Sequence, residues 1–583
     1  MAGGSTHDAA FVAKLDRRTR HNEKLLLYFI LSMLAILLFF TLLHLARRPG
    51  GRQEQEGEKP CVVTRLSRSI RSVTLRSAWG LPSLGHVIVV GVYVVVNLVI
   101  AFANLGRDDL PMITNVASRT AWLAMGNLIF VVLLALKNTP LAFLTAWSYE
   151  RLNVLHRVAG YTTVALVVIH ASCYSSYFVR GGRTEVLRKA EQIYGMLAGI
   201  SFVLLAVAGA VVRRWWYELF YYLHVTFWIV AVVTLGLHQP DLGEKAVVVT
   251  ALVGAGWALD RLVRLARFAI YCPNNRVELA PLPNRGTRVT LAKAPAGAVS
   301  GKHCFLWIPG IRACEAHPFT VVALDPLEFV VSSCDGFTHD LHRYALSHPG
   351  SLRRASVDGT YGTVPDPAAY DTVVLVAGGT GASFTFGVAL DMLQKLRDGE
   401  SKHVVFVWAA KHSSHLDCFQ DHLVTLRNDR RVSISLFVTR QAEPPTGPSS
   451  AAPQPADGTS TRTTGADAEK GPVPSIRSQD SGLSMGSEKA SPACRATPST
   501  TAIEVQPQPQ RRPAHIHGIP IAYERPDVPA LVRAALAQTP AHRRAVVLGC
   551  GPGALMKQVR NTTAASIRPE GPGVELHCEQ FGW

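Results

Sequence analysis

The chain has 583 residues, of which 48% are hydrophobic, and it carries a formal net charge of +17. A chain of this length can form about three domains. Its arginines cluster beside long apolar runs, which is typical of contact with anionic lipid headgroups, so we exclude nucleic acid as the partner of the basic charge.

Seven apolar segments follow a polar N-terminal tail, residues 1–24. Each segment is near the roughly 20 residues that a helix needs to cross a bilayer. We therefore expect a helical transmembrane domain over residues 25–266. The predicted spans are Leu25–Leu45, His86–Leu105, Ala121–Leu136, Leu152–Tyr177, Ile193–Val212, Leu219–Leu237 and Ala246–Leu265.

Positive charge indicates which side of the membrane each connection faces. Arginines crowd the link between spans one and two, Arg213 and Arg214 precede span six, and Arg261 and Arg267 lie at the end of span seven. Seven crossings put these three places on the same side. We therefore expect the region after the last span in the cytosol and the N-terminus outside.

Two spans each carry two histidines fourteen residues apart, His156 with His170 and His224 with His238. This interval is nearly four helical turns, so both rings lie on one face, separated by roughly 21 Å along the axis. Two such helices side by side present an inner pair, His156 and His224, and an outer pair, His170 and His238. Each pair could ligate one haem iron from both axial positions. The alternative is that each ring only hydrogen-bonds to a neighbour, but ionisable groups in membrane segments are rare and usually functional.

Residues 267–365 change composition and alternate β-rich runs with Gly and Pro turns, which predicts a small antiparallel β-barrel. Within this region stands His317-Pro318-Phe319-Thr320, followed by a predicted strand, Val321–Leu324. Further on, Gly336-Phe337-Thr338 opens a helical pattern. Taken alone, the first of these motifs could be no more than a turn before a strand.

Residues 366–583 have an α/β pattern. The apolar strand Thr372–Ala377 runs into Gly378-Gly379-Thr380-Gly381, and a helical pattern follows to about Leu396. Glycines between a strand and a helix allow a phosphate to approach the backbone and the helix N-terminus. The motif is not the G-x-G-x-x-G fingerprint, and a tight turn without a ligand is the alternative.

A second turn of this kind comes near the C-terminus. Strand Ala545–Gly549 leads into Cys550-Gly551-Pro552, and a helix follows. Between the two turns, residues 441–515 are rich in Pro, Ser, Thr and Gly, which predicts a disordered insert because such a composition cannot bury a core. The terminal Trp583 could pack on a flat group or remain unpacked.

The motifs and their order resemble the ferric reductase and NADPH oxidase superfamily, specifically the fungal ferric/cupric-chelate reductases. The resemblance covers roughly residues 80–440 and 516–583. It rests on two H-x13-H helices followed by HPFT, GGTG, CGPG and a terminal aromatic residue. It implies that the β-barrel is a ferredoxin-reductase-like FAD-binding domain and that the α/β region binds NADPH.

The resemblance also implies a role for each motif. Residues of the HPFT and GFT segments would bind FAD, the two glycine turns would bind NADPH, and the terminal aromatic residue would shield the flavin. The four histidines would be the axial ligands of two b-type haems. The implied cofactor-binding residues are His317, Pro318, Phe319, Thr320, Gly336, Phe337, Thr338, Gly359, Tyr361, Gly378, Gly379, Thr380, Gly381, Cys550, Gly551, Pro552 and Trp583.

The implied activity is a plasma-membrane oxidoreductase that moves electrons from cytosolic NADPH through FAD and two haems to a ferric or cupric chelate outside. No general acid or base is required of the protein. One alternative is an NADPH oxidase that reduces O₂ to superoxide, but the short loops around the His238 helix leave little protein to enclose oxygen. The other is a non-enzymatic haem membrane protein with a degenerate flavoprotein region, which would bind no FAD.

Overall fold

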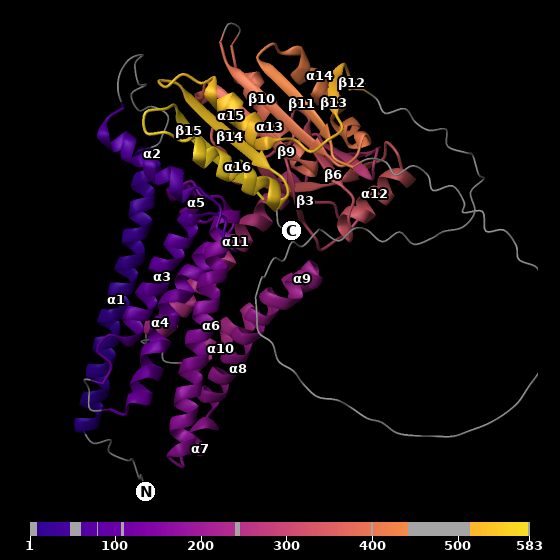
Figure 1. Cartoon of the computed structure of the whole chain (residues 1–583). Helices are drawn as coiled ribbons and strands as arrows, with labels where there is room; N and C mark the ends of the chain where they lie inside the picture. The colour runs from indigo at the N-terminus through magenta and orange to yellow at the C-terminus, as the bar shows by residue number, and fades with distance from the viewer. Residues whose placement is uncertain are drawn as a thin grey trace, which may run out of the picture. The chain divides into compact units, whose positions relative to one another are not determined.

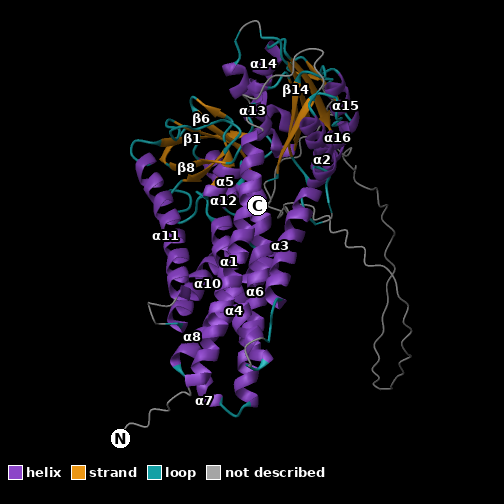
Figure 2. Ribbon diagram, turned by 90° about the vertical axis from the view of Figure 1, so that its left-hand side faces the viewer, coloured by secondary structure: helices purple, strands orange, loops and turns teal. Residues whose placement is uncertain are grey.

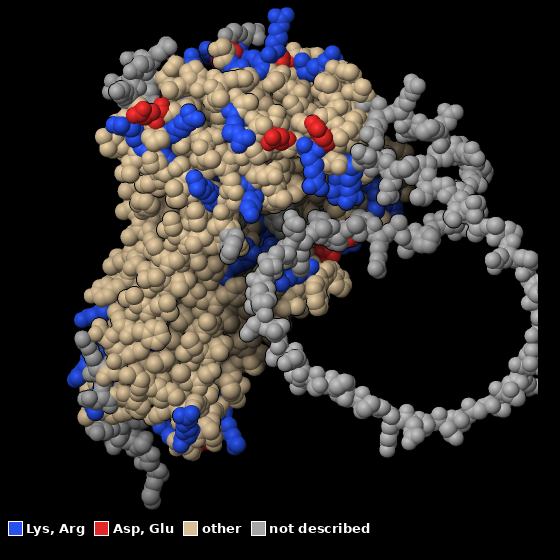
Figure 3. Space-filling model, in the orientation of Figure 1, with Lys and Arg blue, Asp and Glu red and all other residues tan. Residues whose placement is uncertain are grey.

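The computed structural model describes residues 9–46, 60–78, 80–106, 110–239, 245–397, 400–440 and 514–580. Within these ranges, seven helical segments are long and apolar enough to cross a membrane, which confirms the predicted number of spans. A broad band over these helices is nearly without charged side chains, as contact with lipid requires (Figure 3). The spanning helices are α1 (Ala9–Ala46), α3 (Leu84–Phe102), α4 (Met112–Ala135), α6 (Tyr149–Arg180), α8 (Ala190–Val207), α10 (Tyr217–His238) and α11 (Lys245–Tyr271) (Figure 1).

Helix α1 begins at Ala9, so the prediction of a tail over residues 1–24 is wrong from that residue onwards. The polar side chains of this first part have partners on α4. Arg18 Nη1 donates to the carbonyl of Thr114 at 3.3 Å, and Asn22 Nδ2 donates to Ser118 Oγ at 3.0 Å. Such long-range contacts satisfy polar groups that a hydropathy profile counts only as unfavourable.

The third span begins at Met112, nine residues before its predicted start at Ala121, for the same reason. Its first turns carry Arg119, whose side chain is only 3% exposed. The guanidinium donates to Asn22 Oδ1 at 2.6 Å and to the carbonyl of Ile100 at 2.9 Å. A buried arginine is tolerated here because its donors are satisfied inside the bundle.

Short helices complete the membrane domain. Helix α5 is started by Thr139, whose hydroxyl accepts from the Leu141 amide, and by Pro140 in its first turn. The π-helix extends the α8 span to Trp215. These elements are α2 (Val62–Thr74), α5 (Pro140–Thr145), α7 (Thr184–Leu187), the π-helix η1 (Ala208–Val212) and α9 (Arg213–Trp215).

The next region contains two antiparallel sheets, as its composition predicts. The five-stranded sheet has the order β5-β6-β2-β1-β7, and the three-stranded sheet has the order β4-β3-β8. The HPFT motif is itself strand β4, paired with β3, and the predicted strand Val321–Leu324 is confirmed only over its second half, Ala323–Leu324, which is β5. The elements are β1 (Arg276–Leu282), β2 (Gly286–Leu291), β3 (His303–Trp307), β4 (His317–Thr320), β5 (Ala323–Leu324), β6 (Leu327–Ser332), α12 (Phe337–Ser347), β7 (Leu352–Arg354) and β8 (Ser356–Tyr361).

The α/β region forms a seven-stranded sheet of order β12-β13-β11-β10-β9-β14-β15, parallel except for β12. Alternate residues of the buried central strand β9 contact α13 on one face and α15 and α16 on the other. Figure 2 shows α13 on one side of the sheet that contains β14, and α15 and α16 on the other side. The elements are η2 (Pro367–Ala369), β9 (Thr372–Gly378), η3 (Gly379–Gly381), α13 (Ala382–Lys395), β10 (His403–Ala410), η4 (Ser413–Phe419), α14 (Gln420–Asn428), β11 (Val432–Val438), β12 (His515–Ile516), β13 (Ile519–Ala522), α15 (Val528–Ala537), β14 (Arg544–Cys550), α16 (Gly553–Ser566) and β15 (Gly573–Glu579).

The boundaries of the predicted regions shift by a few residues. Helix α11 continues to Tyr271, beyond the predicted end at residue 266. The predicted insert at 441–515 lies outside the described residues except at its end, where His515 pairs with Pro520. The last residues of that segment therefore belong to the sheet rather than to an insert.

Candidate functional site

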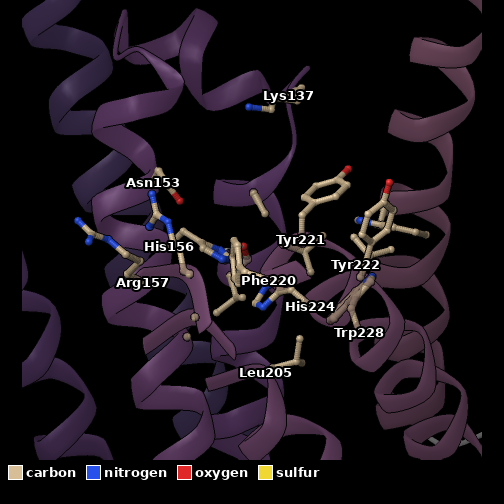
Figure 4. A pocket seen from close by; sticks show the side chains of 18 of the residues that line it. Lys137, Asn153, His156, Arg157, Leu205, Phe220, Tyr221, Tyr222, His224 and Trp228 are labelled. Atoms are coloured by element: carbon tan, nitrogen blue, oxygen red, sulfur yellow. Dashed lines mark hydrogen bonds between the residues drawn. The ribbon is translucent and has the colours of Figure 1, made fainter. Parts of the chain in front are cut away.

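The structure brings the four histidines together as two pairs. The ring centroids of His156 and His224 lie 6.4 Å apart, and those of His170 and His238 lie 6.5 Å apart. Helix α6 supplies the first ring of each pair and α10 supplies the second. Figure 4 shows His156 and His224 directed toward each other from these two helices. The gap within each pair accommodates two metal–nitrogen bonds of about 2 Å each.

Backbone carbonyl groups hold three of these rings in place. His156 Nδ1 donates to the carbonyl of Val131 at 2.9 Å, and His170 Nδ1 donates to that of Ala117 at 2.9 Å. His238 Nδ1 donates to the carbonyl of Glu191 at 2.7 Å. A ring that donates through Nδ1 leaves Nε2 deprotonated, which is the form in which histidine ligates a metal. The tautomer is therefore suited to ligation.

Two glycines border the space at the inner pair. A Cβ at Gly160 on α6, or at Gly209 in the π-helix, would meet no atom within 4 Å. Both glycines line a cavity of about 430 Å³ that also contains His156 and His224. A volume of this size is typical of a cofactor site. The inner pair therefore lies beside space that a large flat ligand could occupy.

The same cavity reaches the HPFT strand. Its lining includes His317 and Pro318 of β4 and Phe305 of β3, together with the histidine pair. The cavity is also basic on balance, because five cationic side chains line it against two carboxylates, Glu218 and Glu315. The cationic side chains could bind carboxylates of a ligand. These residues are Lys137, Arg157, Arg213, Arg261 and Arg264.

The HPFT and GFT segments meet although nineteen positions separate their first residues. The ring of His317 stacks on Phe337 with centroids 4.5 Å apart, and Phe319 lies 6.1 Å from Phe337. Gly336 caps α12 with a φ of +60°, which favours glycine. Thr338 Oγ1 accepts from the Cys334 amide at 2.9 Å. The structure therefore brings five predicted residues of the two segments together, and Thr320 ends the same strand, β4.

Gly359 and Tyr361 lie on β8, on the far side of β3 from the HPFT strand. The Tyr361 hydroxyl donates to the Asp358 carboxylate at 2.7 Å and accepts from Arg267 at 3.1 Å. Burial, followed by the neighbouring Asp358 charge, raises the pKa of Tyr361, so the hydroxyl stays protonated. This side chain faces helix α11 instead of the HPFT strand.

The two glycine turns contact each other through their backbones. Strands β9 and β14 are parallel neighbours, so both turns lie at the same edge of the sheet. A Cβ at Gly381 would lie 2.2 Å from the Cys550 carbonyl oxygen, and one at Gly551 would lie 3.0 Å from the Cα of Gly378. The strand order reverses at β9, and doubly wound sheets bind nucleotides at such a switch point. Gly379 and Thr380 form the intervening 3₁₀ turn, Pro552 caps α16, and Trp583 lies outside the described residues.

Charged residues between these sites were missed by the sequence analysis. Arg312 Nη1 donates to Glu315 Oε1 at 2.9 Å, Glu315 Oε2 accepts from His317 at 2.9 Å, and Glu218 Oε1 lies 3.7 Å from Arg312. Burial alone would raise the pKa of Glu315, but the bonds from His317 and Arg312 outweigh it and lower that pKa. The only sequence signal was an acidic residue, Glu218, at the start of an apolar span.

Cys550 is expected to be inert toward thiol reagents, despite its position in the glycine turn. Burial, followed by the Glu579 charge, raises the pKa of its thiol, and only 4% of the residue is exposed. Because the thiolate is the reactive form, iodoacetamide at pH 8 should label Cys550 at least about tenfold more slowly than the exposed Cys334. Peptide mass spectrometry measures both rates, and equal rates would contradict the burial.

Gly195→Ala is expected to displace His238. The added Cβ would lie 2.6 Å from both Cε1 and Nδ1 of the His238 ring. We expect a loss of about one of two haem equivalents in the purified protein, measured by pyridine haemochrome absorbance. Gly199→Ala is the matched control one turn further on α8, since its Cβ meets nothing closer than 3.9 Å. Equal haem contents in the two variants would contradict the assignment of His238 as a haem ligand.

Seven spans joined to a doubly wound nucleotide-binding sheet define an integral membrane protein with a nucleotide-binding module. The family described as "Ferric reductase like transmembrane component" matches residues 120–235, and "Ferric reductase NAD binding domain" matches residues 370–564. Both halves of the same architecture are thus recognised in one chain, in the expected order. The chain is therefore similar to ferric reductases in both its membrane-spanning region and its nucleotide-binding region.

Three curated relatives illustrate the range of similarity. The chain is 25% identical to "Ferric reductase transmembrane component 1" of Schizosaccharomyces pombe, over 55% of this chain and 64% of that protein. It is 27% identical to "Probable cell surface ferric reductase kap2" of Aspergillus oryzae, over 60% and 51%. It is 24% identical to "Ferric/cupric reductase transmembrane component 2" of Saccharomyces cerevisiae, over 80% and 61%. The chain spans about half to two thirds of the length of these relatives.

Proposed function

We propose that the protein is a transmembrane ferric- or cupric-chelate reductase that uses NADPH, FAD and two b-type haems. It would reduce an external chelate at the plasma membrane and so support iron or copper uptake. When bound, FAD takes a hydride from NADPH and the haems carry single electrons across the bilayer. The protein's own task is to hold these groups in sequence and in the correct orientation.

The observation that carries the proposal is the cavity shared by the inner histidine pair and the HPFT strand. His156 and His224 would hold the inner haem, and the basic residues that line the same cavity would bind its propionates. His317 and Pro318 would contact FAD at the other end of that cavity. An electron donor and its acceptor would therefore share one cavity, without a protein layer between them.

The outer pair supports an acceptor outside the membrane. His238 is the last residue of α10 and is half-buried, and α11 starts at Lys245. On the other side of the pair, α6 ends at Arg180 and connects to α8 through the single turn of α7. The outer haem held by His170 and His238 would thus lie near the surface, where a bulky chelate can approach.

The nucleotide site is supported by the two glycine turns. Their backbones meet at the switch point of the sheet, where free N–H groups of α13 and α16 face the same edge. The family match to an NAD-binding domain covers both turns. NADPH bound there would extend toward the segment that contains Cys550, Gly551 and Pro552.

Reconstitution into proteoliposomes tests the proposal. We expect NADPH-driven reduction of an Fe(III) chelate on the face opposite to NADPH, unchanged by superoxide dismutase. His238→Ala should stop this reduction while the flavin is still reduced by NADPH. Complete loss of reduction with dismutase would show that superoxide is the product, and absence of bound flavin would show that the protein is not an enzyme of this kind.

A further inference from the structure

Helix α2 exposes an apolar face. Its apolar side chains recur at helical spacing, so they share one face, and none of them is covered by the described residues. Val63 is 75% exposed and Leu66 is 60% exposed. An isolated exposed leucine is ordinary, but a whole helical face is not. The face consists of Val62, Val63, Leu66, Ile70 and Val73.

The opposite face of α2 is basic and contacts the nucleotide-binding domain. Arg68 is only 7% exposed, and its Nη1 donates to the carbonyl of Pro569 at 3.2 Å. Arg65 Nη1 lies 3.5 Å from Glu570, and just after the helix Ser77 Oγ donates to Asn561 of α16 at 2.8 Å. The usual arrangement is therefore inverted, because the charged face meets protein and the apolar face is left outside.

The position of α2 in the chain identifies what covers this face. The helix lies between two membrane-spanning helices, α1 and α3, so it cannot move far from the bilayer surface. Its 13 residues include three arginines and no acidic residue, which matches a layer of anionic headgroups. A short, strongly amphipathic basic helix is typical of segments that lie in the membrane interface.

We infer that α2 is an interfacial helix, with its apolar face in the lipid headgroup and upper acyl region. Its occupant is membrane lipid rather than a second protein. Arg68 bonds to the loop before β15, and Ser77 bonds to helix α16. Through these contacts α2 ties the nucleotide-binding domain to the bilayer surface. This role concerns membrane attachment and does not depend on the electron acceptor or on the haems.

Photo-crosslinking of the full chain tests whether membrane lipid covers the apolar face of α2. The photoreactive residue benzoylphenylalanine is placed at Leu66, or at Val424 of α14 as a control exposed aliphatic position, 40% exposed. Each protein is irradiated in nanodiscs of phosphatidylcholine with phosphatidylserine. We expect lipid adducts at position 66 and none at position 424. Absence of lipid adducts at 66, or a protein adduct in their place, would overturn the inference.

A second measurement tests the tie to the nucleotide-binding domain. In nanodiscs, Leu66→Glu with Ile70→Glu should raise hydrogen exchange of α16 amides by roughly tenfold, because two large side chains lose their lipid contact. Val424→Glu should leave that exchange unchanged. Bound flavin and haem in both variants would show that the protein is folded. Equal exchange of the α16 amides in the two variants would then refute the attachment through α2.

Discussion

His224→Ala is expected to lower transmembrane electron transfer by at least about 100-fold, while NADPH still reduces the flavin. The physical reason is geometric. The rings of His156 and His224 face each other with centroids 6.4 Å apart. Among the described residues, the other histidine that lines this cavity is His317 on β4. In the proposed arrangement, His156 would then be the only one of the two histidines left to hold the inner haem.

Two measurements follow this variant. Pyridine haemochrome absorbance should fall by about one of two equivalents, and stopped-flow absorbance should show flavin reduction by NADPH at the rate of the unmodified protein. His86→Ala is the matched control, because His86 is also a buried histidine of a membrane span. Its Nδ1 lies 2.8 Å from Ser83 Oγ and it belongs to neither pair. Retention of both haems in His224→Ala would refute the ligand assignment.

Asp358→Ala is expected to lower the free energy of unfolding of the antiparallel β-sheet region by about 3–5 kcal/mol, the usual cost of breaking a buried ion pair. The Asp358 side chain is fully buried. Its carboxylate accepts from Arg264 Nε at 2.7 Å and from the Tyr361 hydroxyl at 2.7 Å, and Arg267 lies 3.5 Å away. Loss of the carboxylate leaves the Arg264 guanidinium buried without its counter-ion.

Because Arg264 and Arg267 belong to α11 and Asp358 to β8, this ion pair also joins the last span to the barrel strand. We therefore expect slower electron transfer from flavin to haem in Asp358→Ala, with flavin reduction by NADPH less affected. Guanidinium denaturation followed by flavin fluorescence measures the stability change. Asp429→Ala removes an Asp–Arg pair that is partly exposed, 18% for the carboxylate, and should cost no more than about 1 kcal/mol. Equal losses of unfolding free energy in the two variants would contradict a stabilising role of the buried Asp358–Arg264 ion pair.

Several features of the fold were predictable from sequence because they depend on local periodicity. A run of apolar residues long enough to cross a bilayer identifies a span whatever its neighbours are. The predicted span from Leu219 to Leu237 differs from α10 by two residues at its start and one at its end. The strand–glycine–helix order around Gly378–Gly381 is equally local, and the structure contains β9, η3 and α13 there.

The errors have a common cause, because they fall where polar groups are satisfied by distant residues. The start of α1 and the start of α4 were missed since Arg18, Asn22 and Arg119 bond across the bundle. The HPFT motif was not predicted as a strand because its pairing with β3 is a long-range contact.

The sequence by itself determined the number of spans, the two fourteen-residue histidine intervals and the glycine turns, since each is written in consecutive residues. The pairing of the histidines that these intervals predicted is confirmed. Only the tertiary structure decided that Ala117 and Val131 of α4 orient both rings of α6, and that the inner pair and the HPFT strand line one cavity. It also decided that the basic face of α2 meets protein while its apolar face is left exposed. These features require segments far apart in the chain to pack side by side, and no local pattern of residues encodes that choice.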